Sequence, residues 1–114
     1  MKTRSDISTG PTARQRVVRV ADAIIRGDLG LIEGSRRLCE IRAEHGSLRD
    51  DADFGVFVAI ESETDHLPIG DVRAHWSPDA LLVKDREIRA AEEFYRESAI
   101  AACRRLIERF ADEI

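Results

Sequence analysis

The amino-acid sequence predicts an all-α domain, and three observations support this fold class. Apolar residues recur at intervals of three and four along the chain, which is the spacing of one helix face. The single β-rich segment, at residues 54–60, has no second strand candidate to pair with. A chain of 114 residues is long enough for one core only. We therefore expect a small helical bundle in residues 12–114, preceded by a flexible leader at residues 1–11.

The first two helices are expected to form an N-terminal hairpin. Thr12 is predicted to open the first helix, and Gly27 to end it, because glycine accepts the left-handed conformation of a helix C-cap. Asp28 is predicted to cap the second helix, which runs to about His45. Gly34 lies on the apolar line of this second helix, so another part of the chain is expected to approach it closely.

A short third helix with a long ordered loop is expected next. Residues 53–63 fit a strand by composition and a helix by spacing, and we favour a helix capped by Asp53 because a lone strand would be marginal. Residues 62–77 contain the breakers Pro68 and Gly70 and then form the loop. Three apolar residues of the loop are expected to pack down onto the bundle: Leu67, Ile69 and Trp76.

A long C-terminal helix is predicted to begin at Ser77, which is followed by proline at the first helical position and an acid in the first turn. About 34 residues would span roughly 50 Å, more than a compact domain of this size. We expect either a break at residues 83–85 or an overhanging end that meets a second subunit. Ion pairs are expected on its surface between Asp85 and Arg89 and between Glu92 and Arg96. Its apolar line consists of Leu81, Ile88, Tyr95, Ala99, Ala102, Leu106 and Phe110.

Charge is distributed unevenly along the chain. Residues 1–49 hold ten basic and six acidic residues, whereas residues 50–114 hold eight basic and sixteen acidic ones. Residues 50–72 contain seven acids and no Lys or Arg. Such a stretch repels nucleic-acid backbones and attracts basic proteins, but it is equally compatible with a solvated loop. The seven acids are Asp50, Asp51, Asp53, Glu61, Glu63, Asp65 and Asp71.

Composition and cysteine content indicate a cytoplasmic protein. No stretch approaches the roughly 20 apolar residues of a membrane span, and residues 1–10 lack the apolar run of a signal peptide. Cys39 and Cys103 are interpreted as reduced, mostly buried thiols. The three histidines do not have the spacing of a metal site, so we expect neither a metal nor another cofactor.

A buried polar site is an alternative use of the charged residues. Glu33 and Arg37 have the spacing of a helix ion pair, and residues 61–66 gather carboxylates, a hydroxyl and an imidazole. No nucleophile elbow, phosphate loop or oxyanion signature accompanies them, so enzymatic activity is not favoured. The residues of this alternative site are Glu33, Arg37, Glu61, Asp65 and His66.

The chain resembles known proteins in two respects. The orders Ile-Glu-Gly-Ser-Arg-Arg-Leu at residues 32–38, Glu-Ser-Glu-Thr-Asp-His-Leu-Pro at 61–68 and Cys-Arg-Arg-Leu-Ile at 103–107 resemble a family of small bacterial proteins of unknown function. This resemblance implies a compact helical domain and no active site. In size and acidity the chain is also similar to immunity proteins of contact-dependent inhibition and bacteriocin systems.

We therefore expect a non-enzymatic protein-binding module. Its most concrete form is an immunity-type inhibitor whose acidic face neutralises a basic partner such as a nuclease toxin. Two alternatives remain open: a small enzyme or ligand-binding protein, and a homodimeric structural or regulatory subunit. Binding to nucleic acid or to a membrane is not expected.

Overall fold

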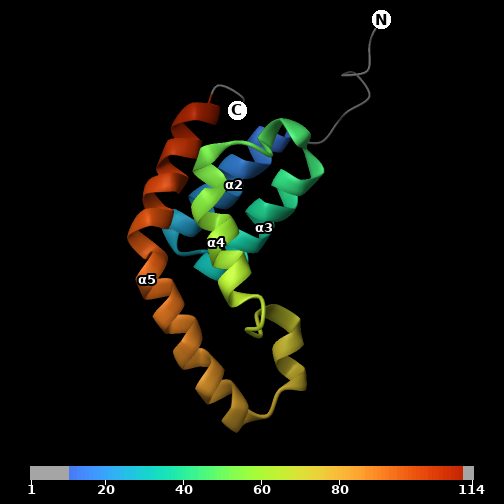
Figure 1. The fold of residues 1–114 in the computed structure, drawn as a ribbon, viewed down its shortest axis with the longest axis vertical. Helices are drawn as coiled ribbons and strands as arrows, with labels where there is room; N and C mark the ends of the chain where they lie inside the picture. Colours follow the sequence, from blue (N-terminus) through green and yellow to red (C-terminus); the bar gives the residue numbers. More distant parts are fainter. Residues whose placement is uncertain (1–10, 112–114) are drawn as a thin grey trace, which may run out of the picture.

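The computed structural model describes residues 11–111, and these fold as the predicted helical bundle (Figure 1). The flexible leader predicted for residues 1–11 lies almost wholly outside this range. No β-strand occurs among the described residues. The α-helices are α2 (Ala13–Arg26), α3 (Leu31–Glu44), α4 (Gly55–Thr64) and α5 (Pro78–Phe110), and the 3-10 helices are η1 (Gly46–Leu48), η2 (Ala52–Phe54) and η3 (Gly70–His75).

The predicted N-terminal hairpin is formed by α2 and α3. Thr12 caps α2 in a capping box with Gln15, and Gly27 ends it with a φ of 80°. The prediction that Asp28 caps the next helix is wrong, because α3 begins at Leu31 with Gly30 as its N-cap. Residues 28 and 29 belong to the turn between the two helices, because both of their amides donate to the carbonyl of Ala23.

Gly34 allows the two helices of the hairpin to approach closely, as predicted. A Cβ atom at this position would lie only 2.5 Å from Cγ1 and Cδ1 of Ile24 on α2. Ile24 is itself almost fully buried, so its side chain occupies the space that any larger residue at 34 would need.

The ambiguous segment is helical, although its cap differs from the prediction. Asp51, not Asp53, accepts the capping hydrogen bond, from the amide of Asp53 at 3.0 Å, and η2 then leads directly into α4. The Asp53 carboxylate is bound elsewhere, by arginines of α5. Phe54 and Phe57 are fully buried, so the β-rich composition of this segment reflects a helix turned toward the core.

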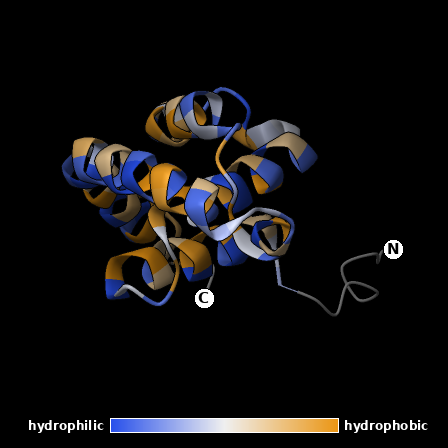
Figure 2. Cartoon of the chain, turned by 90° about the horizontal axis from the view of Figure 1, so that it is seen from below, coloured by the Kyte–Doolittle hydropathy of each residue, from blue (hydrophilic) through white to orange (hydrophobic). Residues whose placement is uncertain are grey.

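The core lies where α2, α3 and α4 meet the C-terminal half of α5. Figure 2 shows apolar and polar residues alternating around the helix turns, as expected for amphipathic helices that share one core. The buried residues of α5 all lie in its last twelve positions: Ala99, Ala102, Cys103, Leu106 and Phe110.

The other half of α5 extends beyond the bundle. The helix is continuous, so the predicted break at residues 83–85 is wrong and the predicted overhang is present. The molecule measures 58 × 29 × 24 Å because of this extension. The loop beside it contains η3, an element absent from the sequence prediction. Leu67 of the loop is buried, while Ile69 and Trp76 are half-buried.

Candidate interaction surface

Two carboxylates of the acidic run are bound inside the protein. Arg109 of α5 donates to both oxygens of Asp51, at 3.0 and 2.8 Å, and to Asp53 at 2.7 Å. Arg105, one turn earlier, donates to the other oxygen of Asp53 at 2.8 Å. The carboxylate side chains are only 10% and 17% exposed. This cluster ties the segment before α4 to the last helix.

The arginines also change the acidity of these two groups. The hydrogen bond from Arg109 holds the pKa of Asp51 below its usual value, although partial burial opposes this effect. The hydrogen bond from Arg105 lowers the pKa of Asp53 in the same way. Both carboxylates are therefore ionised and neutralised by the chain itself. The sequence gives no sign of these counter-ions, because they lie more than fifty residues away along the chain.

The remaining five acids of the run do not form one patch. Glu61 lies near Cys39, where burial and then this carboxylate raise the pKa of the thiol, and Glu63 lies near Tyr95, where it raises the pKa of the hydroxyl. Asp50 precedes α4 and Asp65 follows it, so this helix of ten residues, about 15 Å long, lies between them. Asp50, Asp65 and Asp71 are exposed.

The five residues of the alternative polar site form three separate sets of contacts. Arg37 pairs with Glu33 at 2.9 Å on the surface of α3, as predicted. His66 contacts Glu87 of α5 at 3.1 Å and lies 3.9 Å from Asp65. Glu61 lies near Cys39 and adds to the raised pKa of its thiol. No hydrogen bond or ion pair between described residues joins these three sets.

The two cysteines are free and buried, as predicted. Burial raises the pKa of each thiol to about 12, and the Glu61 carboxylate adds to this effect at Cys39. Within residues 11–111, no group of three or more His, Cys, Asp or Glu side chains could hold a metal ion. None of the helices in the described part of the chain combines the length and apolar character needed to cross a membrane.

The most exposed large apolar side chains lie on α5, on the half that extends from the bundle. Phe94 is 78% exposed and packs only its edge against Tyr95, with ring centroids 4.9 Å apart. Val83 is 52% exposed, and Leu82 beside it is 62% exposed. Val83 and Phe94 share one side of the helix, opposite its buried residues, with two small residues. We call this side, made of Val83, Ala90, Phe94 and Ala101, the outer face of α5.

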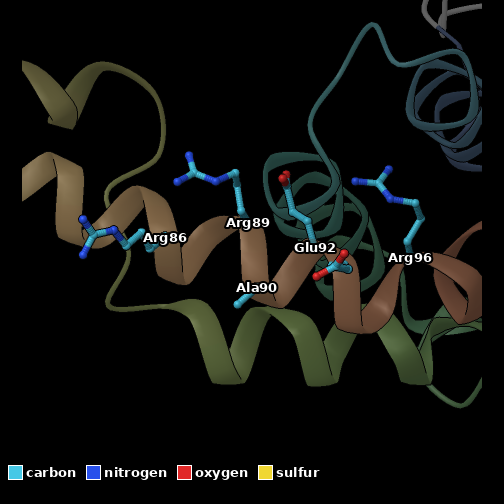
Figure 3. Close-up of a pocket in the computed structure, with 6 residues that line it drawn as sticks. Arg86, Arg89, Ala90, Glu92 and Arg96 are labelled. Atoms are coloured by element: carbon cyan, nitrogen blue, oxygen red, sulfur yellow. The ribbon is translucent and has the colours of Figure 1, made fainter.

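Open hollows adjoin the two alanines of the outer face. One, of about 570 Å³, is lined by Ala90 and by longer charged side chains around it (Figure 3). A second, of about 520 Å³, is lined by Ala101, by Ile100 and by four charged residues. Figure 3 shows the contrast in length between Arg86, Arg89 and Arg96 and the short side chain of Ala90.

Several charged residues of α5 lack the partners that the sequence predicts. Asp85 is bound by both terminal nitrogens of Arg73, at 2.8 and 3.1 Å, instead of pairing with Arg89. Glu92 and Arg96 form no ion pair with each other. Among the described residues, Arg86 and Arg104 also form none, and both are exposed.

Comparison of the chain with protein-family models, with curated proteins and with solved structures finds no match. The resemblances given by the sequence therefore stay predictions.

Proposed function

We propose that the protein is a non-enzymatic protein-binding module and that it binds through the outer face of α5. One observation carries the proposal: Phe94 is 78% exposed on a helix whose other end is part of the core. Isolated exposed apolar residues are ordinary, but a phenylalanine and a valine aligned on one helix side together with two alanines form an apolar stripe of the kind that partners cover.

The outer face is held on a firm support. Five buried side chains anchor the far end of α5 in the core, and the Arg73–Asp85 pair holds the loop segment against its near end. Binding therefore costs little ordering of the helix itself, which favours affinity for a given contact area. The large apolar residues can be desolvated without unfolding anything else.

Photo-cross-linking tests this proposal. A photo-reactive phenylalanine analogue placed at position 94 is expected to give a discrete protein cross-link in the cells that make the protein. The same analogue at Ala43, an exposed position on α3, is the matched control and is expected to give none. No cross-link at position 94, or an equal yield at both positions, would overturn the assignment of the outer face.

A second candidate function uses the acids that remain at the surface. Asp50, Asp65 and Asp71 are exposed, and no Lys or Arg pairs with them among the described residues. These charges support the immunity-type inhibitor that binds a basic partner such as a nuclease toxin. The acidic surface of this proposal contains fewer carboxylates than the sequence suggests, because arginines of α5 already neutralise Asp51 and Asp53.

Charge reversal separates the two candidate functions. Replacing Asp50, Asp65 and Asp71 by lysine is expected to abolish salt-sensitive binding to a basic partner while leaving the cross-link at position 94 intact. Phe94→Glu is expected to have the opposite pattern. Binding that survives the three lysines would exclude the electrostatic, immunity-type mode.

A further inference from the structure

We propose that the occupant of the outer face of α5 is a second copy of the chain, bound antiparallel. This inference rests on the proposed function and names its partner. The order of small, large and charged residues along the exposed part of the helix supports it.

The apolar residues of the outer face are arranged symmetrically. Val83, Ala90, Phe94 and Ala101 follow one another at intervals of seven, four and seven residues, so all four share one side of the helix. This set of intervals reads the same in both directions. When two such helices pair antiparallel about the centre of the series, Phe94 of one copy lies opposite Ala90 of the other. Val83 then lies opposite Ala101.

Size complementarity follows from this pairing. Each large side chain meets an alanine, and each alanine borders one of the two open hollows. Each large side chain therefore faces a small one, as in knobs-into-holes packing. A parallel pair in register would instead place Phe94 on Phe94 and leave both hollows unfilled.

The charged residues beside the outer face share the same symmetry. Asp79, Arg86, Glu97 and Arg104 form a second line along α5, at intervals of seven, eleven and seven. Its centre lies within half a residue of the centre of the apolar series. Antiparallel pairing thus sets Arg86 opposite Glu97 of the second copy and Asp79 opposite Arg104. None of the four has an ion-pair partner among the described residues, so these contacts replace solvent and no internal pair is broken.

Charge also favours the antiparallel orientation. In a parallel pair in register, identical residues lie level with each other, so Arg86 of one copy and Glu97 of the other would be eleven residues, or about 16 Å, apart along the axis. Only the antiparallel pair brings the opposite charges of this line together. Because α5 curves with its convex side away from the other helices, contact is closest near the centre (Figure 1). Phe94, Arg86 and Glu97 are therefore the residues to vary.

Sedimentation analysis of the full chain at tens of micromolar is the first experiment. The wild type is expected to be a dimer, and Phe94→Glu is expected to raise the dissociation constant at least about tenfold, since each copy would bury an unpaired charge. Arg19→Glu on α2 changes charge outside the outer face and is expected to leave the dimer intact. A monomeric wild type would overturn the inference.

Charge exchange supplies a test that misfolding cannot imitate. Arg86→Glu and Glu97→Arg are each expected to weaken the dimer, because each creates two like-charge contacts. The double variant is expected to restore it, because the ion pair returns with its charges exchanged. Absence of rescue would contradict the predicted pairing of these two residues.

The orientation is measured by spin labels at Asp79→Cys, because the native thiols are buried. An antiparallel dimer puts the two labels roughly 38 Å apart or more, and a parallel dimer roughly 10 Å apart. A short distance would overturn the antiparallel geometry.

If the wild type is monomeric while position 94 still cross-links to a different protein, the self-pairing fails and the proposed function stands. No cross-link of any kind rejects both.

Discussion

The two halves of α5 differ in what covers them and in what they expose. The C-terminal half buries one side in the core and presents Glu97, Arg104 and Glu108 on the opposite side, as expected for a solvated helix. The N-terminal half buries no residue completely and presents Val83 and Phe94 outward. Large apolar side chains of this half therefore lie at positions that do not contribute to the core. The difference supports the proposal that the projecting half contacts a partner outside the core.

The largest expected effect contrasts a leucine from each half. Leu106→Ala removes a fully buried side chain and is expected to cost about 2–5 kcal/mol of unfolding free energy. Leu82→Ala removes a side chain that is mostly exposed and is expected to change the free energy by less than about 0.5 kcal/mol in the monomer. Urea unfolding followed by circular dichroism at low protein concentration measures both. Similar losses would mean that the projecting half belongs to the core.

The next effect concerns the hairpin against which the C-terminal half packs. Gly34→Ala adds a methyl group 2.5 Å from the side chain of Ile24 and is expected to destabilise the fold by about 1–3 kcal/mol, despite the better helix propensity of alanine. Thermal unfolding measures the change. In an Ile24→Ala background the same substitution should be neutral or stabilising, because the space is then free. An additive double variant would contradict the close approach.

A smaller effect, dependent on pH, is expected at the carboxylates that hold the C-terminal half. The lowered pKa values of Asp51 and Asp53 mean that their ion pairs add stability above the ordinary aspartate pKa of about 3.9, and that this stability is lost as the pH falls through the lower folded values. Replacing both by asparagine is expected to cost about 1 kcal/mol at neutral pH and to flatten the acid loss.

Equilibrium unfolding from pH 7 down to about pH 2 tests this expectation. Asp50→Asn, an exposed neighbour outside the ion-pair cluster, is the matched control. A double variant that retains the full acid dependence of the wild type would show that other groups cause it.

The smallest effect is local to the projecting half. Arg73→Gln removes the two hydrogen bonds to Asp85 that hold η3 beside α5. Hydrogen exchange of residues 70–75 is expected to accelerate, while the midpoint of global unfolding stays unchanged, because this segment contributes no fully buried residue. A lowered midpoint would show that η3 and the bundle unfold together.

Much of the helical architecture could be predicted from local signals. Thr12 and Ser77 were identifiable as caps, Gly27 as a terminator and Gly34 as a point of close approach, because each depends on backbone chemistry within a few residues. Asp28 and Asp53, which the sequence predicts as N-caps, do not cap α3 and α4. In those places the turn hydrogen bonds to Ala23 and the ion pairs to α5 compete with the local capping signal.

The candidate surface could be predicted only in part. An overhanging end of the last helix followed from its length, since rise per residue sets how far a helix extends. The apolar residues of its outer face could not be recognised as a surface, because they lie outside the periodic apolar line that predicts the core-facing side of the helix. The pairing of the acids could not be predicted either. Residues 50–72 contain no Lys or Arg, but Arg105 and Arg109 of α5 neutralise Asp51 and Asp53.

The sequence by itself determined the number and type of the main helices, because caps, glycine breaks and apolar periodicity act over a few residues. Tertiary structure alone decided how much of each apolar line is covered and which charges pair between different elements. Both depend on contacts between residues far apart in the chain, such as Asp53 with Arg109. The spacing within one helix predicts a local pair such as Glu33 with Arg37, but ion pairs between elements exist only in the assembled bundle and leave no signal in a single helix.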